Sequence, residues 1–302
     1  MKKIDLTVII VAYNSQDTIK DCVDSVVKTI KKNEYEIIVS DNSANNLTEE
    51  KIKVLEREYK NLYYMHNKEN LGFSKGNNAG IRKANGRYVL FLNPDTKVYE
   101  NTIDGMIDFM EKNPDCGAST CFVELPDGSL DDSSHRGFPT PGNSFSHFSG
   151  LSKIFAKNKM FGGYNLTYLD TSKTHEIDAL AGSFMIVPFE IGEKLNWWDE
   201  DYFFYGEDID FCYRLKKAGY KIYFVPEFRC LHLKGISSGI KKVSNGVSKA
   251  SIETKKWATN HRFKAMEIFY NKHYRKVYPA ILSNAVLLGI KLKKQLAIRS
   301  IK

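Results

Sequence analysis

The chain of 302 residues lacks several features that would assign it to a familiar class of protein. Its five cysteines are scattered without a CxxC pair or a zinc-ligand spacing, so we expect free, mostly buried thiols. The most apolar late stretch, residues 279–290, is shorter than the roughly 20 residues that span a bilayer. We also expect no signal peptide, because the apolar run near the N-terminus has no small-residue cleavage site.

Two common phosphate-binding motifs are missing as well. No GxGxxG follows the first apolar segment, and neither GxxxxGKS nor GxxxxGKT is present. These absences argue against a dinucleotide-dependent dehydrogenase and against a P-loop ATPase. Any nucleotide site in this chain must therefore be built differently.

The sequence does contain an alternation of strand-like and helix-like segments. Apolar, β-branched runs at residues 6–14, 35–43, 61–67 and 87–95 predict buried strands. Segments with helical spacing separate them, which predicts an α/β fold with a mainly parallel central sheet flanked by helices. The other expected elements are helices at 18–31, 47–60 and 103–112, a loop entering a helix at 70–86 with Gly86 as its C-cap, a strand at 116–125, and a long loop region with short pieces at 126–176. Further along the chain we expect a strand-like segment at 177–188, a helix starting near Glu207, a closing strand after Gly219, a loop at 230–239 and a largely helical end at 248–302.

Polar side chains follow three of the predicted strands at the point where each strand ends. Because ligands of open α/β sheets bind at the carboxyl ends of strands, three such ends together predict a binding site, although a single one would suggest only an ordinary turn. An Asp at a strand end can hold a divalent cation that bridges phosphates, and Asp95 is placed in this way. The strand-end residues are Tyr13, Asn14, Asp41, Asn42, Asn93 and Asp95.

In combination, these segments resemble the family 2 inverting glycosyltransferases of the GT-A fold, in particular bacterial rhamnosyltransferase-like members. The resemblance implies a GT-A catalytic domain over residues 1–240, with a Rossmann-like nucleotide-binding half, and a helical C-terminal extension over 241–302. The matching stretches are VIIVAYNS, EIIVSDNSAN, NLGFSKGNNAGIRKANGRYVLFLNPDT, AGSFMIVP, FFYGEDIDFCYRLKKAGYKIYFVP and HLKGISSG.

The resemblance also implies roles for individual residues. Asp41 would hydrogen-bond the pyrimidine ring of the donor. Asn93 stands where the family has the first Asp of its Asp-x-Asp motif, so Asp95 would carry most of the binding of Mn²⁺ or Mg²⁺, with His232 as a late metal or diphosphate contact. The residues expected to bind the nucleotide-sugar donor are Ala12, Tyr13, Asn14, Asp41, Asn42, Asn70, Gly72, Phe73, Lys75, Asn78 and Asn93.

A second acidic cluster, Glu207, Asp208 and Asp210, starts a predicted helix. The helix dipole stabilises carboxylates at such a position, and we interpret Asp210 as a simple helix cap. Inverting transfer needs a carboxylate base to take the proton of the attacking sugar hydroxyl. In the resembled family the base comes from this pair, so we choose Asp208 and keep Glu207 as the alternative. Aromatic residues 197–205 suit sugar faces or a lipid-linked acceptor, although core packing would explain most of them.

The resemblance predicts a metal-assisted transfer of L-rhamnose from dTDP-L-rhamnose to a lipid-linked cell-surface polysaccharide. A UDP-hexose donor is the first alternative. A nucleotidyltransferase also uses strand-end Asp residues, but it usually carries a Gly-rich phosphate loop near the first strand, and none is present here. A binding module without catalysis is disfavoured by the presence of Asp95, Asp208 and His232.

The C-terminal end is strongly basic. The net charge of the chain is +8, and much of the excess lies after residue 240. A basic amphipathic segment predicts contact with an anionic membrane surface, here the inner face of the cytoplasmic membrane, which would make the protein cytoplasmic and peripheral. A homodimer contact is the alternative for the apolar residues of this segment. Nucleic-acid binding is not expected, because no recognition motif accompanies the basic residues.

Overall fold

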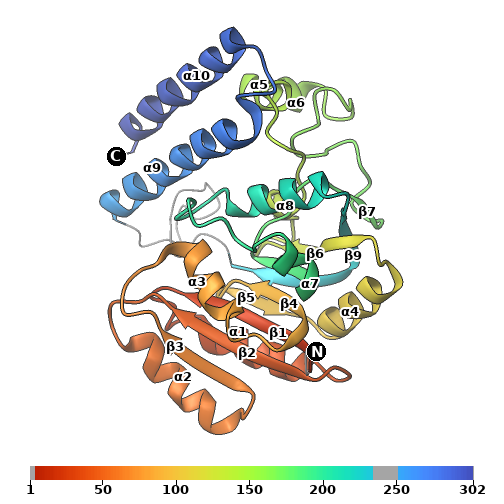
Figure 1. Ribbon diagram of the computed structural model, residues 1–302, viewed down its shortest axis with the longest axis vertical. Coiled ribbons are helices and arrows are strands. Elements are labelled where there is room, and N and C mark those ends of the chain that lie inside the picture. The colour runs from red at the N-terminus through yellow and green to blue at the C-terminus, as the bar shows by residue number, and fades with distance from the viewer. Residues whose placement is uncertain (1–3, 234–250, 302) are drawn as a thin grey trace.

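The computed structural model describes residues 4–233 and 251–301, which form one mixed sheet with helices on both faces (Figure 1). The strand order is β3-β2-β1-β4-β8-β6-β9-β5, and β7 pairs with β9. The strands are β1 Ile4–Ala12, β2 Tyr35–Asp41, β3 Leu62–His66, β4 Gly86–Leu92, β5 Thr96–Val98, β6 Cys116–Glu124, β7 His175–Glu176, β8 Phe184–Pro188 and β9 Lys221–His232. The helices are α1 Ile19–Thr29, α2 Leu47–Glu58, α3 Gly72–Ile81, α4 Thr102–Lys112, η1 Asp132–Ser134, α5 Pro141–Ser149, α6 Leu151–Ile154, α7 Phe189–Lys194, α8 Glu207–Lys217, α9 Ile252–Phe269, η3 Tyr270–Tyr274 and α10 Ala280–Arg299.

The side chains of β1 explain why the sheet is covered on both faces. Leu6, Val8 and Ile10 belong to the buried cluster that contains α1, α2 and α4. Ile9, which points the opposite way, belongs to the cluster that contains α3, α7 and α8. Because successive side chains of a strand point to opposite faces, a continuous apolar run is what a doubly covered strand requires.

The first half of the sheet is parallel, as predicted. Strand β1 pairs in parallel with β2 and β4, and β2 pairs in parallel with β3. In the second half, β8 is antiparallel to β4 and β6, whereas β9 is parallel to β6 and antiparallel to β5 and β7. The predicted α/β architecture, with a central sheet, flanking helices and a helical C-terminal region, is confirmed.

Two local predictions are wrong. Gly86 is not a helix C-cap but the first residue of β4, where an added Cβ would lie 2.2 Å from the backbone nitrogen of Thr7. Residues 230–232, predicted as loop, are the last three of β9, because they pair with the short strand β5. The region 126–176 is a long loop region with short elements, as predicted; these elements are η1, α5, α6 and β7. The five cysteines are free and buried, as predicted.

The C-terminal helices α9 and α10 lie side by side (Figure 1), and Ile209 and Tyr213 of α8 pack against the cluster that α9 and η3 form. Phe269, Tyr270 and Tyr274 share a buried cluster with Tyr202, just before α8. This region is therefore packed onto the rest of the molecule through a core of its own. The predicted boundary between residues 240 and 241 lies outside the described residues. Among the described helices, none combines the length and the apolar character needed to cross a bilayer.

Candidate active site

A cavity of about 2130 Å³ opens at the carboxyl edge of the parallel strands and extends to α5, α9 and α10. Most of the residues predicted from the sequence lie on its walls. Those that do are Tyr13, Asn14, Asn42, Asn70, Gly72, Phe73, Asn93, Asp95, Glu207, Asp208 and His232.

The other predicted residues, Ala12, Asp41, Lys75 and Asn78, do not line this cavity. Ala12 and Asp41 are completely buried at the ends of β1 and β2. One carboxylate oxygen of Asp41 accepts hydrogen bonds from Ser43 and the other accepts one from the Tyr64 hydroxyl. Asp41 therefore holds the strand-end loop, and its expected contact with a pyrimidine ring stays a prediction.

Gly72 and Phe73 form the part of the cavity wall where α3 begins. Gly72 has φ +79°, and a Cβ on it would lie 2.3 Å from the Phe203 carbonyl oxygen, so only glycine fits this turn. The same carbonyl accepts a hydrogen bond from the Phe73 backbone nitrogen at 2.8 Å. The Asn42 side chain donates to the Gly72 carbonyl at 2.9 Å. Asn42 and Gly72, both predicted to bind the nucleotide-sugar donor, are thus joined by a hydrogen bond from a side chain to a backbone carbonyl.

Asp95 and His232 meet because β5 pairs with the end of β9. The Leu233 backbone nitrogen donates to the Asp95 carbonyl at 3.0 Å, and Nε2 of His232 lies 3.3 Å from Oδ1 of Asp95. On the other side of the ring, Nδ1 of His232 lies 3.1 Å from Oδ2 of the fully buried Asp131. When Nδ1 donates to Asp131, Nε2 presents a lone pair toward Asp95, as in many metal-binding histidines.

The chemistry of these donors fits a divalent cation only in part. Among residues 4–233 and 251–301, no group of three or more His, Cys, Asp and Glu side chains is arranged to hold a metal ion. Asp95 and His232 would supply two ligands, and hard cations such as Mg²⁺ take the rest from water and substrate phosphates. The pair therefore fits a cation that binds together with a diphosphate.

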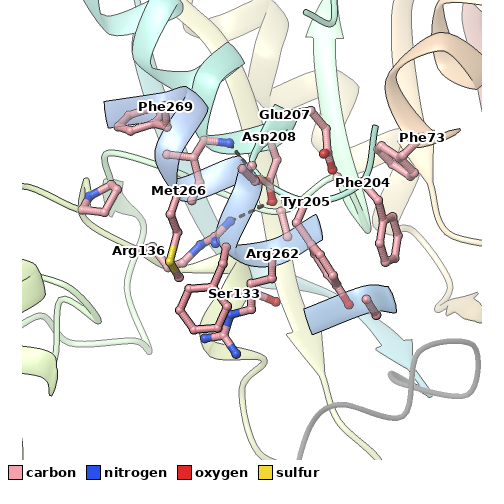
Figure 2. A pocket seen from close by; sticks show the side chains of 18 of the residues that line it. Phe73, Ser133, Arg136, Phe204, Tyr205, Glu207, Asp208, Arg262, Met266 and Phe269 are labelled. Carbon is pink, nitrogen blue, oxygen red and sulfur yellow. Dashed lines mark hydrogen bonds and ion pairs between the residues drawn. The ribbon is translucent and has the colours of Figure 1, made fainter. Parts of the chain in front are cut away.

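Glu207 and Asp208 enter the cavity from the first turn of α8. Tyr205 and Gly206, just before this helix, have φ of +71° and +85°. This left-handed turn is unfavourable for Tyr205, and its cost of about 1 kcal/mol or more is typical of backbone held in place at a functional site. It directs the N-terminus of α8 and its two carboxyl groups toward the cavity (Figure 2).

Asp208 forms an ion pair that the sequence did not reveal. Nη2 of Arg136 lies 2.8 Å from Oδ2 of Asp208, and the side chains are only 12% and 14% exposed. Figure 2 shows the Arg136 guanidinium directed at Asp208 inside the pocket. Arg136 also donates to the Leu180 carbonyl, and Oδ1 of Asp208 accepts from the Ile209 nitrogen at 2.8 Å. Asp208 is thereby held in one orientation.

Glu207 has a different environment. Burial raises its pKa well above the usual value, and the neighbouring Asp208 adds to this effect. Its Oε2 has no hydrogen-bond partner within the described part of the chain. Burial therefore favours the protonated form of Glu207, whereas Asp208 has a cationic partner. Such a difference between two adjacent carboxyl groups typically separates their chemical roles.

Asp210 is not the simple helix cap that the sequence suggested. Its side chain caps no backbone group of α8; it is completely buried and accepts from Arg214 at 2.7 Å and from His273 at 2.6 Å. His273 belongs to η3, so this contact ties the C-terminal region to the helix that carries Asp208. Burial would raise the pKa of Asp210, but the hydrogen bond from His273 and the charge of Arg214 together hold it below its usual value.

Arg136 and Asp131 are the site residues that sequence reasoning missed. Both lie in the segment 126–176, which has no regular hydrophobic period. The only local signal is the charged stretch DDSSHR at 131–136. Nothing in that stretch indicates that one residue pairs with His232 and another with Asp208.

Comparison with known proteins agrees with this geometry. The model of glycosyl transferase family 2 matches residues 7–176, more than half of the chain. The chain belongs to glycosyl transferase family 2. The model of glycosyl transferase family group 2 also matches residues 140–290.

Two relatives are rhamnosyltransferases by name. Rhamnosyltransferase WbbL of Escherichia coli is 31% identical over 233 residues, which cover 74% of this chain and 82% of the relative. The N-acetylglucosaminyl-diphospho-decaprenol L-rhamnosyltransferase of Mycobacterium tuberculosis is 31% identical over 152 residues, 50% of this chain. That match spans about half of the mycobacterial protein, 48% of its length. The chain is thus a glycosyltransferase, and its sequence is similar to those of rhamnosyltransferases.

A solved structure supports the fold. The mannosyltransferase PcManGT from Pyrobaculum calidifontis, in complex with GDP-Man and Mn²⁺, superposes with a TM-score of 0.59. The match covers 98% of this chain and 72% of that one at 15% identity. The fold of this chain is accordingly the GT-A fold expected from its sequence.

Proposed function

We propose that this glycosyltransferase moves L-rhamnose from dTDP-L-rhamnose to a saccharide on a lipid carrier, with inversion at the anomeric carbon. One observation carries the mechanism. The Asp208–Arg136 pair and the Asp95–His232 pair lie on the walls of one cavity at the carboxyl edge of the sheet. Transfer by a single displacement requires a base and a site for the leaving diphosphate, and these pairs supply them.

The role of Asp208 follows from its ion pair. The acceptor hydroxyl oxygen attacks the anomeric carbon while its proton passes to the Asp208 carboxylate. The bond between the anomeric carbon and the diphosphate oxygen breaks, and the nucleoside diphosphate leaves with that electron pair. A base must be unprotonated at the start, which favours Asp208 over Glu207, because burial raises the pKa of Glu207. Arg136 keeps the Asp208 carboxylate in position.

The other pair would receive the leaving group. A Mn²⁺ or Mg²⁺ ion held by Asp95 and His232 would neutralise charge on the departing diphosphate. Asp131 holds the His232 ring through Nδ1. Nδ2 of Asn93 lies 3.3 Å from Nε2 of the same ring. Tyr13, Asn14 and Asn42 would then line the nucleoside side of the donor.

Nucleotide binding tests the proposal directly. We would titrate the purified full chain with dTDP, UDP, GDP and ADP by calorimetry, each with Mn²⁺ and with Mg²⁺. Tightest binding of dTDP is expected, and preference for UDP would move the donor to a UDP-hexose. Absence of binding by all four nucleotides would contradict the transferase mechanism. Transfer from dTDP-L-rhamnose, with dTDP-glucose as the matched control, then tests the sugar.

The outer face of α10 supports a peripheral position on the membrane. Ile281, Leu288, Leu292 and Leu296 are 87%, 57%, 52% and 66% exposed and do not line the cavity. Basic residues accompany them along this helix, a composition suited to an anionic leaflet. The same stripe would also suit a second copy of the chain. Vesicle binding, compared with oligomeric state in solution, separates these two contacts.

A further inference from the structure

The cavity has a second lobe that the donor does not need. Beyond Asp208 it continues between α5, α9 and α10. The apolar side chains lining this lobe are Phe145, Phe148, Met266, Leu282, Val286 and Ile290. Phe145, Phe148 and Leu282 remain 68%, 46% and 40% exposed, so this wall is apolar surface that no other part of the described chain covers.

Helix α10 presents separate apolar faces to the cavity and to the outside. Leu282, Val286 and Ile290 recur every four residues on the cavity side, whereas Leu288 and Leu292 do not line the cavity. A helix that packs only against its neighbour needs one apolar stripe. Val286 also packs against the buried cluster of α9 and η3, so the cavity face extends the packed face of α10 and is continuous with the candidate active site.

Two cations stand among these apolar residues. Arg262 of α9 and Lys293 of α10 both line the lobe, and Nζ of Lys293 lies 3.2 Å from the centre of the Phe148 ring. Asp132 and Glu253 line the same cavity, but within residues 4–233 and 251–301 neither Arg262 nor Lys293 forms an ion pair with a carboxylate. Figure 2 shows Arg262 in the same pocket as Arg136 and Asp208.

The electrostatic environment of this lobe favours an anion. Burial lowers the pKa of Lys293, and the positive charge of Arg262 lowers it further. The pKa of His147, also on the wall, is lowered by burial and then by Lys293 and Arg262. An anion that binds between two cations offsets their mutual repulsion, and an apolar tail on that anion would cover the apolar wall beside them.

We propose that this lobe binds the carrier of the acceptor: Arg262 and Lys293 contact its diphosphate, and the apolar wall of α5, α9 and α10 contacts its first isoprenoid units. This inference rests on the proposed function, because it assumes a lipid-linked acceptor. The acceptor saccharide then fills the space between Arg262 and Asp208, where its hydroxyl meets the base. The donor diphosphate has a separate place at Asp95 and His232, so the two diphosphates do not compete.

Farnesyl diphosphate is a short, soluble probe for this lobe. We would measure its binding to the full chain by calorimetry, and then to R262Q and K293Q. Each substitution should weaken binding by about tenfold, which corresponds to the loss of about 1.4 kcal/mol from one charge-assisted contact. The matched controls are K264Q and K291Q, which change exposed lysines of the same two helices outside the cavity and should leave the affinity unchanged.

Two further variants test the apolar contact between the lobe and the isoprenoid chain. I290N changes the cavity face of α10 and should weaken farnesyl diphosphate binding, whereas L288N changes the outer face and should not. Equal affinities for inorganic diphosphate and farnesyl diphosphate would overturn the isoprenoid contact.

Competition and dTDP binding separate this inference from the proposed function. Displacement of farnesyl diphosphate by dTDP with Mn²⁺ would overturn the inference, because the probe would then occupy the donor site. Unchanged affinity in R262Q and K293Q would overturn it too, even when dTDP binds as expected. Conversely, probe binding that depends on Arg262 and Lys293, in a protein that binds no dTDP, would overturn only the donor proposal.

Discussion

Replacing Asp208 by Asn separates the chemical role of this carboxylate from its structural role. The substitution keeps the size of the side chain and removes its charge. Nη2 of Arg136 and Oδ2 of Asp208 are 2.8 Å apart at a largely buried position. Two unit charges about 4 Å apart attract by about 4 kcal/mol at the effective dielectric constant of a protein, and desolvation offsets much of this attraction.

The expected loss of stability is smaller than the gross attraction. Removing one partner of a fully buried pair costs roughly 3–5 kcal/mol. We expect D208N to lower the free energy of unfolding by about 2 kcal/mol, because the pair is partly solvated and the Asn oxygen still accepts a hydrogen bond from Arg136. For a chain of this size, such a loss lowers Tm by about 3 °C.

The double variant R136Q/D208N is the matched control. It removes both charges, so no buried guanidinium is left without its counter-ion, and its Tm should lie above that of D208N. Transfer should nevertheless fall by about 100- to 10,000-fold in both variants, because the base is absent. Binding of dTDP should be unchanged in D208N, because the proposed mechanism places this residue on the acceptor side.

Thermal unfolding and an initial-rate transfer assay give the two readouts. Near wild-type transfer by D208N, together with loss of transfer in E207Q, would refute the choice of Asp208 as base and assign that role to Glu207. Equal Tm values for D208N and the double variant would refute the ion-pair reasoning. Loss of dTDP binding in D208N would move this residue to the donor pocket.

Three other substitutions test separate parts of the molecule. D95A should weaken dTDP binding in Mn²⁺ but not in EDTA; equal losses in both would remove Asp95 from the metal site. The pKa of Asp210 is lowered in the folded state, so its stabilising effect is present at neutral pH and lost as the pH falls below about 4. D210N should therefore flatten the acid limb of the stability curve, measured by urea unfolding, and an unchanged limb would contradict the network. L288E/L292E should release the protein from anionic vesicles without lowering Tm, and retained binding would disprove the membrane contact.

Point substitutions are a better test of the membrane contact than deletion of the C-terminal region. Phe269, Tyr270 and Tyr274 form a buried cluster with Tyr202, and His273 binds Asp210. Removing residues after about 250 would expose this cluster and would take the His273 hydrogen bond away from the buried Asp210 carboxylate. Loss of membrane binding by such a truncated chain would then result from unfolding and would not test the membrane contact itself.

The local elements and the binding edge were predictable because they depend on short-range pattern. The apolar run of β1 and the polar residues that follow β1, β2 and β4 are properties of adjacent residues. Because parallel strands end at one edge, alignment of the strands alone brings Asn14, Asn42 and Asp95 together. The errors arose where one local sequence feature is compatible with two different structures. Gly86 resembled a helix cap but serves the close approach of β4 to β1.

By itself, the sequence determined the α/β class, the family resemblance and the edge of the sheet that carries the site, and most of the site residues that it predicted lie on the cavity walls. The tertiary structure alone decided which charges face one another. His232 reaches Asp95 only through the pairing of β5 with β9, and Arg136 reaches Asp208 across 72 positions from a segment without periodicity. Ion pairs and cavities arise from long-range packing, to which neighbouring residues contribute no signal, so the partners of the base and the apolar lobe beside it became visible only in the folded chain.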